Sequence, residues 1–133
     1  MNIRRNRVLV LAADEPMLID LQETLEDWGF DTTTTWDQAE AMQLAGSRQF
    51  DLLLVEDHPP EVTASEILRE LQCSRLSIPC AILQPRRKKT FDSEYFYSLG
   101  ASGVISDWNP NDVGRWVQER FAARAATAGS KAG

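Results

Sequence analysis

Residues 50–60 read FDLLLVEDHPP, and this stretch decides the fold that the sequence predicts. Its centre, Leu52–Val55, is the most apolar strand candidate in the chain. A short strand that is apolar on both faces is typical of a parallel sheet that helices cover on each side. The run stops at Glu56 and Asp57, and two prolines then end the strand in a loop.

The rest of the chain repeats this pattern, because apolar runs alternate with segments of helical spacing. Apolar residues three and four apart, such as Leu18, Leu21 and Leu25, form one face of a helix. Strand and helix alternate five times, and right-handed crossovers then place helices on both faces of the sheet. The sequence therefore predicts an α/β, flavodoxin-like, doubly wound (βα)5 fold, which is a three-layer sandwich around a five-stranded parallel sheet. The expected strands span 8–12, 30–35, 52–55, 78–83 and 104–106, and the fourth helix is expected at 93–99.

The composition bounds the classes of function. A chain of 133 residues with 43% hydrophobic residues is long enough for one packed core. The net charge of −6 argues against general attraction to nucleic-acid phosphates. No run approaches the roughly 20 apolar residues that cross a bilayer, and the N-terminus lacks a signal-peptide core. We expect a cytoplasmic protein that binds neither nucleic acid nor membrane directly, with Cys73 and Cys80 as core residues.

Polar side chains follow four of the expected strands. In doubly wound folds, functional groups gather at the carboxyl ends of the strands, beside the point where the strand order reverses. These polar positions are therefore the candidate functional residues: Asp14 and Glu15, Glu56 and Asp57, Gln84, and Asp107.

Several motifs, in this order and at this spacing, resemble the receiver domain of bacterial two-component response regulators, the CheY-like superfamily. The resemblance covers residues 6–122, nearly the whole chain, and implies a receiver-like domain followed by a flexible C-terminal tail at 123–133. The motifs that carry it are Leu9–Pro16, Phe50–Glu56 with Pro60 four residues on, Ile78-Pro79 and Gly100–Gly103.

The resemblance also implies which positions would carry the family's chemistry. In receivers, two adjacent acidic residues and an aspartate hold Mg²⁺, and that aspartate accepts a phosphoryl group from a histidine kinase. A Thr or Ser and a Lys then bond the phosphate. By the resemblance, Ala13 and Asp14 stand at the positions of the acidic pair, with Glu15 beside them, and Glu56 stands at the position of the phosphoacceptor. Gln84 stands in place of the Thr or Ser, Val104 in place of an aromatic switch residue, and Asp107 in place of the Lys.

These substitutions predict a degenerate receiver. The longer side chain of Glu56 displaces the nucleophile, and positioning is most of what catalyses phosphoryl transfer. Asp107 places a negative charge where a cation would balance the phosphate. Of the family's metal ligands only Asp14 and Glu56 remain, so the resemblance implies at most a weak Mg²⁺ site and no required cofactor.

The leading hypothesis is therefore a pseudo-receiver: a phosphorylation-independent protein-interaction module of signal transduction that is not an enzyme. Its partner would be a histidine kinase or an output protein, with a homodimer as an alternative assembly. Surplus aromatic residues on the fourth helix and after the fifth strand suggest the face that binds this partner. The residues expected there are Tyr95, Phe96 and Trp108.

Two alternatives stay open at this point. The first is a phosphorelay acceptor that is still phosphorylated with Mg²⁺ at Glu56 or Asp57, although strand alternation points Asp57 to the other face of the sheet unless a bulge intervenes. The second is a flavodoxin-like binder of a small ligand, although no Gly-rich phosphate loop follows the first strand. In each case the basic run Arg86–Lys89 either folds back over the acidic edge or forms a solvated loop.

Overall fold

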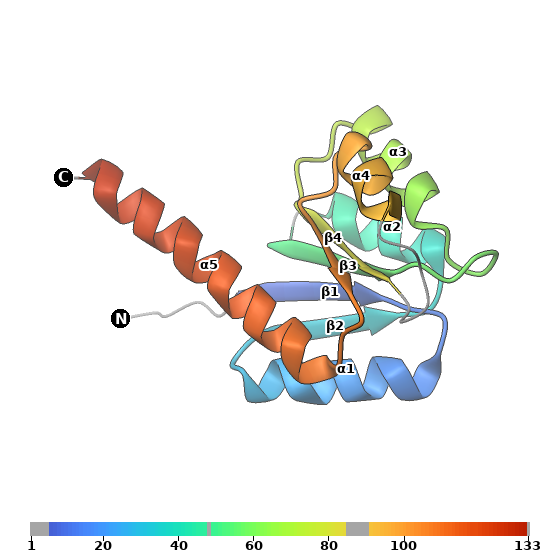
Figure 1. The fold of residues 1–133 in the computed structure, drawn as a ribbon, viewed down its shortest axis with the longest axis horizontal. Helices are drawn as coiled ribbons and strands as arrows, with labels where there is room; N and C mark the ends of the chain where they lie inside the picture. Colours follow the sequence, from blue (N-terminus) through green and yellow to red (C-terminus); the bar gives the residue numbers. More distant parts are fainter. Residues whose placement is uncertain (1–5, 48, 85–90, 133) are drawn as a thin grey trace.

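The computed structural model describes residues 6–47, 49–84 and 91–132, which form one layered α/β structure (Figure 1). Strands and helices alternate along the chain, as the apolar pattern predicts. The strands are β1 (Arg7–Leu11), β2 (Asp31–Thr35), β3 (Leu52–Glu56), β4 (Cys80–Gln84) and β5 (Gly103–Ser106). The helices are α1 (Glu15–Asp27), α2 (Gln38–Gly46), α3 (Ala64–Cys73), α4 (Phe91–Ser98) and α5 (Pro110–Ala132).

All strand pairs are parallel, and the sheet order is β2-β1-β3-β4-β5. The chain first adds β2 on one side of β1 and then continues with β3 on the other side. The strand order therefore reverses between β1 and β3, and the carboxyl ends of these two strands flank the point where doubly wound folds place their ligands. The flavodoxin-like (βα)5 fold is confirmed.

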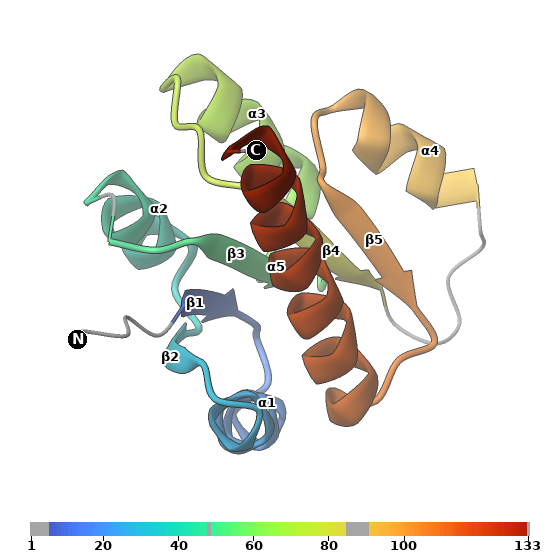
Figure 2. The same cartoon turned by 90° about the vertical axis from the view of Figure 1, so that its left-hand side faces the viewer.

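Helices cover both faces of the sheet and divide the core into two layers (Figure 2). The side chains of β3 alternate between them: Leu52 and Leu54 pack with residues of α1 and α5, while Leu53 and Val55 pack with residues of α2, α3 and α4. All four are fully buried. Because each residue of β3 is covered on its own face, the direction of the next side chain, Glu56, is fixed by the strand.

The backbone of α5 is helical as far as Ala132, and Figure 1 shows this end of the helix extending away from the sheet. The expected flexible tail at 123–133 stays a prediction. The domain boundary at Ala122 stays a prediction. None of the helices within the described ranges is both long and apolar enough to cross a membrane.

Helices α1 and α5 approach closely at a glycine. The indole ring of Trp28, at the end of α1, lies against Gly114 of α5, and its Nε1–H donates a hydrogen bond of 3.1 Å to Oδ1 of Asn111. A Cβ atom at position 114 would lie 2.5 Å from Cδ1 of that ring. The absence of a side chain at Gly114 therefore sets the distance between the two helices on this face.

We predict that Gly114→Ala lowers the free energy of unfolding by about 1–3 kcal/mol, because the added methyl group overlaps the Trp28 ring. Gly46→Ala is the control: this glycine is the last residue of α2, and its Cβ would meet no atom within 4 Å. We expect that variant to gain up to about 1 kcal/mol. Urea unfolding followed by circular dichroism measures both, and equal effects would contradict the close approach of the helices.

Candidate functional site

A cleft opens at the carboxyl ends of β1 and β3, where the strand order reverses. Its volume is about 620 Å³. It combines carboxylates with an apolar wall, a mixture that ligand sites in proteins commonly use. The residues that line it are Ala13, Asp14, Met17, Glu56, His58, Glu61 and Trp108.

Glu56 is the buried carboxylate of this cleft. It is the last residue of β3, its backbone pairs with Leu83 of β4, and only 7% of the residue is exposed. Its Oε1 atom is buried and accepts no hydrogen bond from any described residue. A buried oxygen without a partner carries an energetic cost, so the fold holds Glu56 in a position that stability alone does not favour.

The surroundings of Glu56 raise the pKa of its carboxyl above the ordinary value of 4.5. Burial is the largest cause, because removal from water penalises the charged form. His58 acts in the opposite direction, and the negative charge of Asp14 adds to the increase. Glu56 therefore holds its proton more tightly than an exposed glutamate does.

Asp14 faces the same cleft from the turn between β1 and α1. It is the N-cap residue of α1, but its carboxylate makes no capping hydrogen bond, and the residue is exposed. Ala13 lines the cleft beside it, whereas Glu15 belongs to the first turn of α1 and does not line it. Within the described ranges, no three His, Cys, Asp or Glu side chains converge on a point that could hold a metal ion.

Asp57 has a different role from its neighbour. It is equally buried, at 7% exposure, and its Oδ1 accepts a hydrogen bond of 3.1 Å from the backbone N–H of Ala64. Ala64 is the first residue of α3, and the N-cap residue Thr63 makes no side-chain capping bond. Asp57 therefore satisfies the N-terminus of α3 from the loop before it. It does not line the cleft, in keeping with the alternation of side chains along β3.

Gln84 joins the ends of β4 and β5. It is 1% exposed, and its Oε1 accepts a hydrogen bond of 2.7 Å from the hydroxyl of Ser106, its register partner in β5. Its Nε2 atom has no partner in the described part of the chain. Gln84 and Glu56 lie on adjacent strands, but Gln84 does not line the cleft.

The other two switch-equivalent positions lie outside the cleft. Val104 is half-buried in β5, packs against the core on the side of α2, α3 and α4, and donates its backbone N–H to the Tyr97 hydroxyl. Asp107 is exposed and has a φ of 53°, in the left-handed region that few non-glycine residues occupy. The cleft thus unites only part of the expected site: Ala13, Asp14 and Glu56.

The expected partner face of Tyr95, Phe96 and Trp108 is wrong as a single exposed surface. Phe96 is 4% exposed and packs in the core with α2 and α3, whereas Trp108 is 8% exposed and packs on the opposite side of the sheet with α1 and α5. Each aromatic ring contributes buried apolar surface to the core layer on its own side of the sheet. Of the three, only Tyr95 is exposed, and its hydroxyl accepts a hydrogen bond from Arg69.

Sequence reasoning missed four residues of the cleft, namely Met17, His58, Glu61 and Trp108 as a lining residue. Glu61 follows the two prolines, in a short loop whose ends pair through His58 and Val62. His58 Nε2 lies 3.9 Å from Glu61 Oε2. His58 and Glu61 could have been found by their closeness to Glu56 along the chain, whereas Met17 and Trp108 are distant from it in sequence. The basic run Arg86–Lys89 lies outside the described residues.

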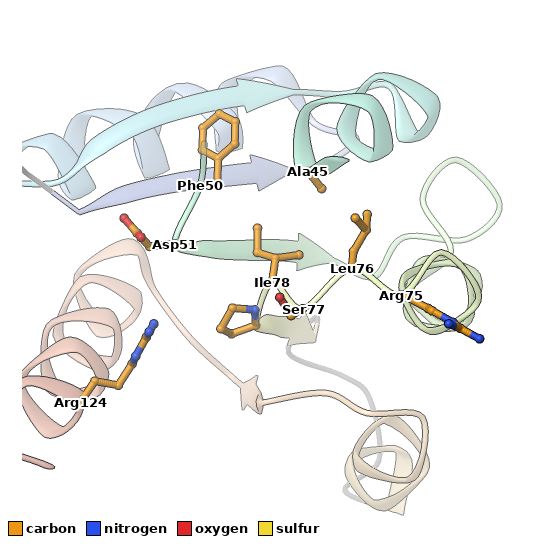
Figure 3. A pocket seen from close by; sticks show the side chains of 9 residues that line it. Ala45, Phe50, Asp51, Arg75, Leu76, Ser77, Ile78 and Arg124 are labelled. Carbon is orange, nitrogen blue, oxygen red and sulfur yellow. The ribbon is translucent and has the colours of Figure 1, made fainter. Parts of the chain in front are cut away.

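A second, smaller pocket of about 310 Å³ lies at the opposite edge of the sheet, where β3 and β4 begin (Figure 3). Asp51 and Arg124 line it from the start of β3 and from α5. The carboxylate of Asp51 accepts a hydrogen bond of 2.8 Å from the backbone N–H of Arg7, so it fixes the start of β1 against β3. Because this pocket is far from the strand-order reversal, the cleft at Glu56 is the better candidate.

Comparison with known proteins agrees with the fold. No family model matches the chain. The chain is 26% identical over 113 residues to the alkaline phosphatase synthesis transcriptional regulatory protein PhoP of Bacillus subtilis, which covers 84% of this chain and 47% of that protein. It is 29% identical over 98 residues to the response regulator SaeR of Staphylococcus aureus, covering 73% of this chain and 42% of that protein. The chain thus spans less than half the length of these relatives.

Solved structures of receiver domains have the same fold as this chain. The receiver domain of a Francisella response regulator superposes with a TM-score of 0.81 at 19% identity, covering 90% of this chain and 99% of that one. A CheY-like receiver domain protein from Methanospirillum hungatei superposes with a TM-score of 0.80 at 18% identity, covering 93% and 99%. These similarities show that the chain has the fold of receiver domains.

Glu56 lines the cleft, and the resemblance to receiver domains implies that it stands at the position of their phosphoacceptor. Asp14 is the one acidic residue of the family's pair that is present, and it faces the same cleft. The adjacent carboxylates Glu56 and Asp57 therefore serve different purposes: one has no hydrogen-bond partner on Oε1 and lines the cleft, and the other anchors α3.

We predict that Glu56→Gln raises the free energy of unfolding at pH 7 by about 1–3 kcal/mol, because the amide keeps the shape and removes a buried charge. The folded domain holds the Glu56 proton to a higher pH than the unfolded chain does. Wild-type stability therefore falls as the pH rises from 4.5 through the raised pKa of folded Glu56, and the advantage of Gln appears over that interval.

Asp57→Ala is the control for that experiment. It removes the acceptor of the Ala64 N–H, so we expect it to lower the free energy of unfolding by about 0.5–2 kcal/mol. Urea unfolding at pH 4 and pH 7 measures both variants. If Glu56→Gln destabilised the domain at pH 7 as Asp57→Ala does, Glu56 would have a stabilising partner, contrary to its assignment as an unpaired carboxylate.

Proposed function

We propose that this receiver domain acts in two-component signal transduction as a protein-interaction module that works without aspartyl phosphorylation. The observation that carries the proposal is the state of Glu56. It occupies the phosphoacceptor position, but its carboxyl is buried, unpaired on Oε1 and raised in pKa. A nucleophile for phosphoryl transfer needs a readily ionised oxygen at a fixed distance from the incoming phosphorus, whereas burial makes the Glu56 carboxyl harder to ionise.

The ligand set supports the same proposal. Receiver domains bind Mg²⁺ in their acidic pocket, and the ion bridges the acceptor and the phosphoryl donor. Here Ala13 replaces one of the acidic pair, and only Asp14 and Glu56 of the expected ligands line the cleft. No third ligand converges with them among the described residues. These residues do not fit a resident Mg²⁺, because hard cations need a shell of oxygen ligands.

A phosphoryl group would also find few groups to hold it. Oε1 of Gln84 already accepts a hydrogen bond from the Ser106 hydroxyl, and Asp107 is acidic where the family's pattern has a cation for the phosphate. A switch needs a ligand that makes different contacts in two conformations. Without such contacts, phosphorylation would supply no free energy to change the partner surface, and no enzymatic turnover is expected.

The partner is a signalling protein of the same pathway class, a histidine kinase or an output protein, in the cytoplasm. The two curated relatives are a transcriptional regulatory protein and a response regulator, which supports this class. A homodimer is the other assembly that we propose to test, and we expect no direct contact with nucleic acid or membrane. The partner surface itself is not assigned to Phe96 or Trp108, because both are buried.

We predict that the domain gains no phosphoryl group when it is incubated with acetyl phosphate and Mg²⁺, because the longer Glu56 side chain displaces the nucleophile and no Lys or Arg of the described residues lines the cleft. Intact-mass spectrometry measures the adduct. The matched positive control is the triple variant Ala13→Asp, Glu56→Asp, Asp107→Lys, which restores the acidic and basic residues of the family's pattern. We expect that variant to show a single phosphoryl adduct.

A phosphoryl adduct on the wild-type protein would overturn the proposal in favour of a phosphorelay acceptor. Glu56→Gln and Asp57→Asn would then identify the acceptor, because only the variant that lacks it loses the adduct. Isothermal titration with MgCl2 gives an independent test, since the proposal expects no saturable binding at millimolar Mg²⁺.

A further inference from the structure

The cleft contains more negative charge than its own residues balance. Asp14, Glu56 and Glu61 line it. His58, whose Nε2 lies 3.9 Å from Glu61 Oε2, is the only basic residue of the described part of the chain that lines it. Glu56 is more than nine-tenths buried, and its Oε1 has no hydrogen-bond partner among the described residues. A carboxylate in this state is stabilised by any cation that can reach it, because the local dielectric is lower than in water.

The rest of the cleft is apolar, which restricts the kind of cation. Ala13, Met17 and Trp108 form this part of the lining. Trp108 is 8% exposed and packs into the core with α1 and α5, so its ring is held in place. A thioether and an indole do not replace the water shell of a metal ion, but they favour a cation that carries alkyl groups.

The size of the cleft agrees with an organic ligand. Its volume of about 620 Å³ exceeds the need of a single metal ion, and it lies within the range of roughly 300–1,000 Å³ that is typical of small-molecule sites. The described residues also lack the three converging ligands of a metal site. The cleft therefore combines an anionic floor, an apolar wall and room for several carbon atoms.

We propose that this cleft binds a primary alkylammonium group, whose N–H donors reach the carboxylates of Glu56 and Asp14 while its alkyl chain lies against Met17 and Trp108. This inference rests on the proposed function, because a phosphoryl group on Glu56 would occupy the same space. The ammonium has two sources: a free small amine, or the lysine side chain of a partner protein.

The test is isothermal titration of the intact domain with n-butylammonium chloride, with tetramethylammonium chloride as a cation that has no N–H donor. We expect saturable binding of the first and much weaker binding of the second. Glu56→Gln should weaken binding of n-butylammonium by about 10- to 100-fold, the loss of a charge-assisted hydrogen bond. Asp20→Asn removes an exposed carboxylate of α1 that does not line the cleft, and it should leave the affinity unchanged.

The source of the ammonium is distinguished by a second ligand, Nα-acetyl-lysine methylamide. If the lysine derivative binds at least as tightly as n-butylammonium, the natural ligand is a lysine side chain of a partner. If n-butylammonium binds and the lysine derivative does not, the natural ligand is a free amine. Nuclear magnetic resonance localises the site in either case, because the indole N–H signal of Trp108 should shift on titration. Met17→Ala should weaken binding several-fold without changing the fold.

Two results would overturn the inference: no saturable binding of n-butylammonium at millimolar concentration, or binding that Glu56→Gln leaves unchanged. Its failure is distinct from failure of the proposed function. A domain that binds no amine and also accepts no phosphoryl group contradicts only the ammonium site, whereas a phosphoryl adduct on Glu56 contradicts the proposed function whatever the amine does.

Discussion

The carboxylate at the end of β3 is the constraint on which the site depends. Leu52–Val55 are fully buried on alternating faces, so the backbone of β3 cannot shift to bring the next residue into water. Glu56 therefore enters the cleft with one oxygen buried and unpaired among the described residues. The apolar packing of two core layers supplies the free energy that keeps this carboxyl out of solvent, and the raised pKa of Glu56 is the consequence.

Glu56 and Asp57 are adjacent and equally buried, but their hydrogen bonding differs. Asp57 is as buried as Glu56, but it points to the other face of the sheet and accepts the N–H of Ala64. Gln84, on the neighbouring strand, bonds Ser106. The polar end of the sheet is thus largely satisfied by contacts that hold strands and helices together. Glu56 Oε1 and Gln84 Nε2 have no partner among the described residues, but of the two residues Glu56 alone lines the cleft, so the proposed binding site is built on it.

The strand and helix pattern could be predicted from the sequence because it is local. Runs such as Leu52–Val55 and the spacing of Leu18, Leu21 and Leu25 specify elements without knowledge of their partners. The surroundings of the polar residues could not be predicted in the same way. Trp108 and Phe96 look alike as candidate surface aromatics, but the two sides of the sheet bury them in different layers.

The most direct test of this account is a carbon-detected nuclear magnetic resonance titration of the Glu56 side-chain carboxyl in the wild-type domain. The account predicts a pKa for Glu56 above the ordinary value of 4.5, because burial penalises the charged form. A pKa at or below 4.5 would contradict it, since this would mean that a cation or a donor within the chain already neutralises the carboxylate.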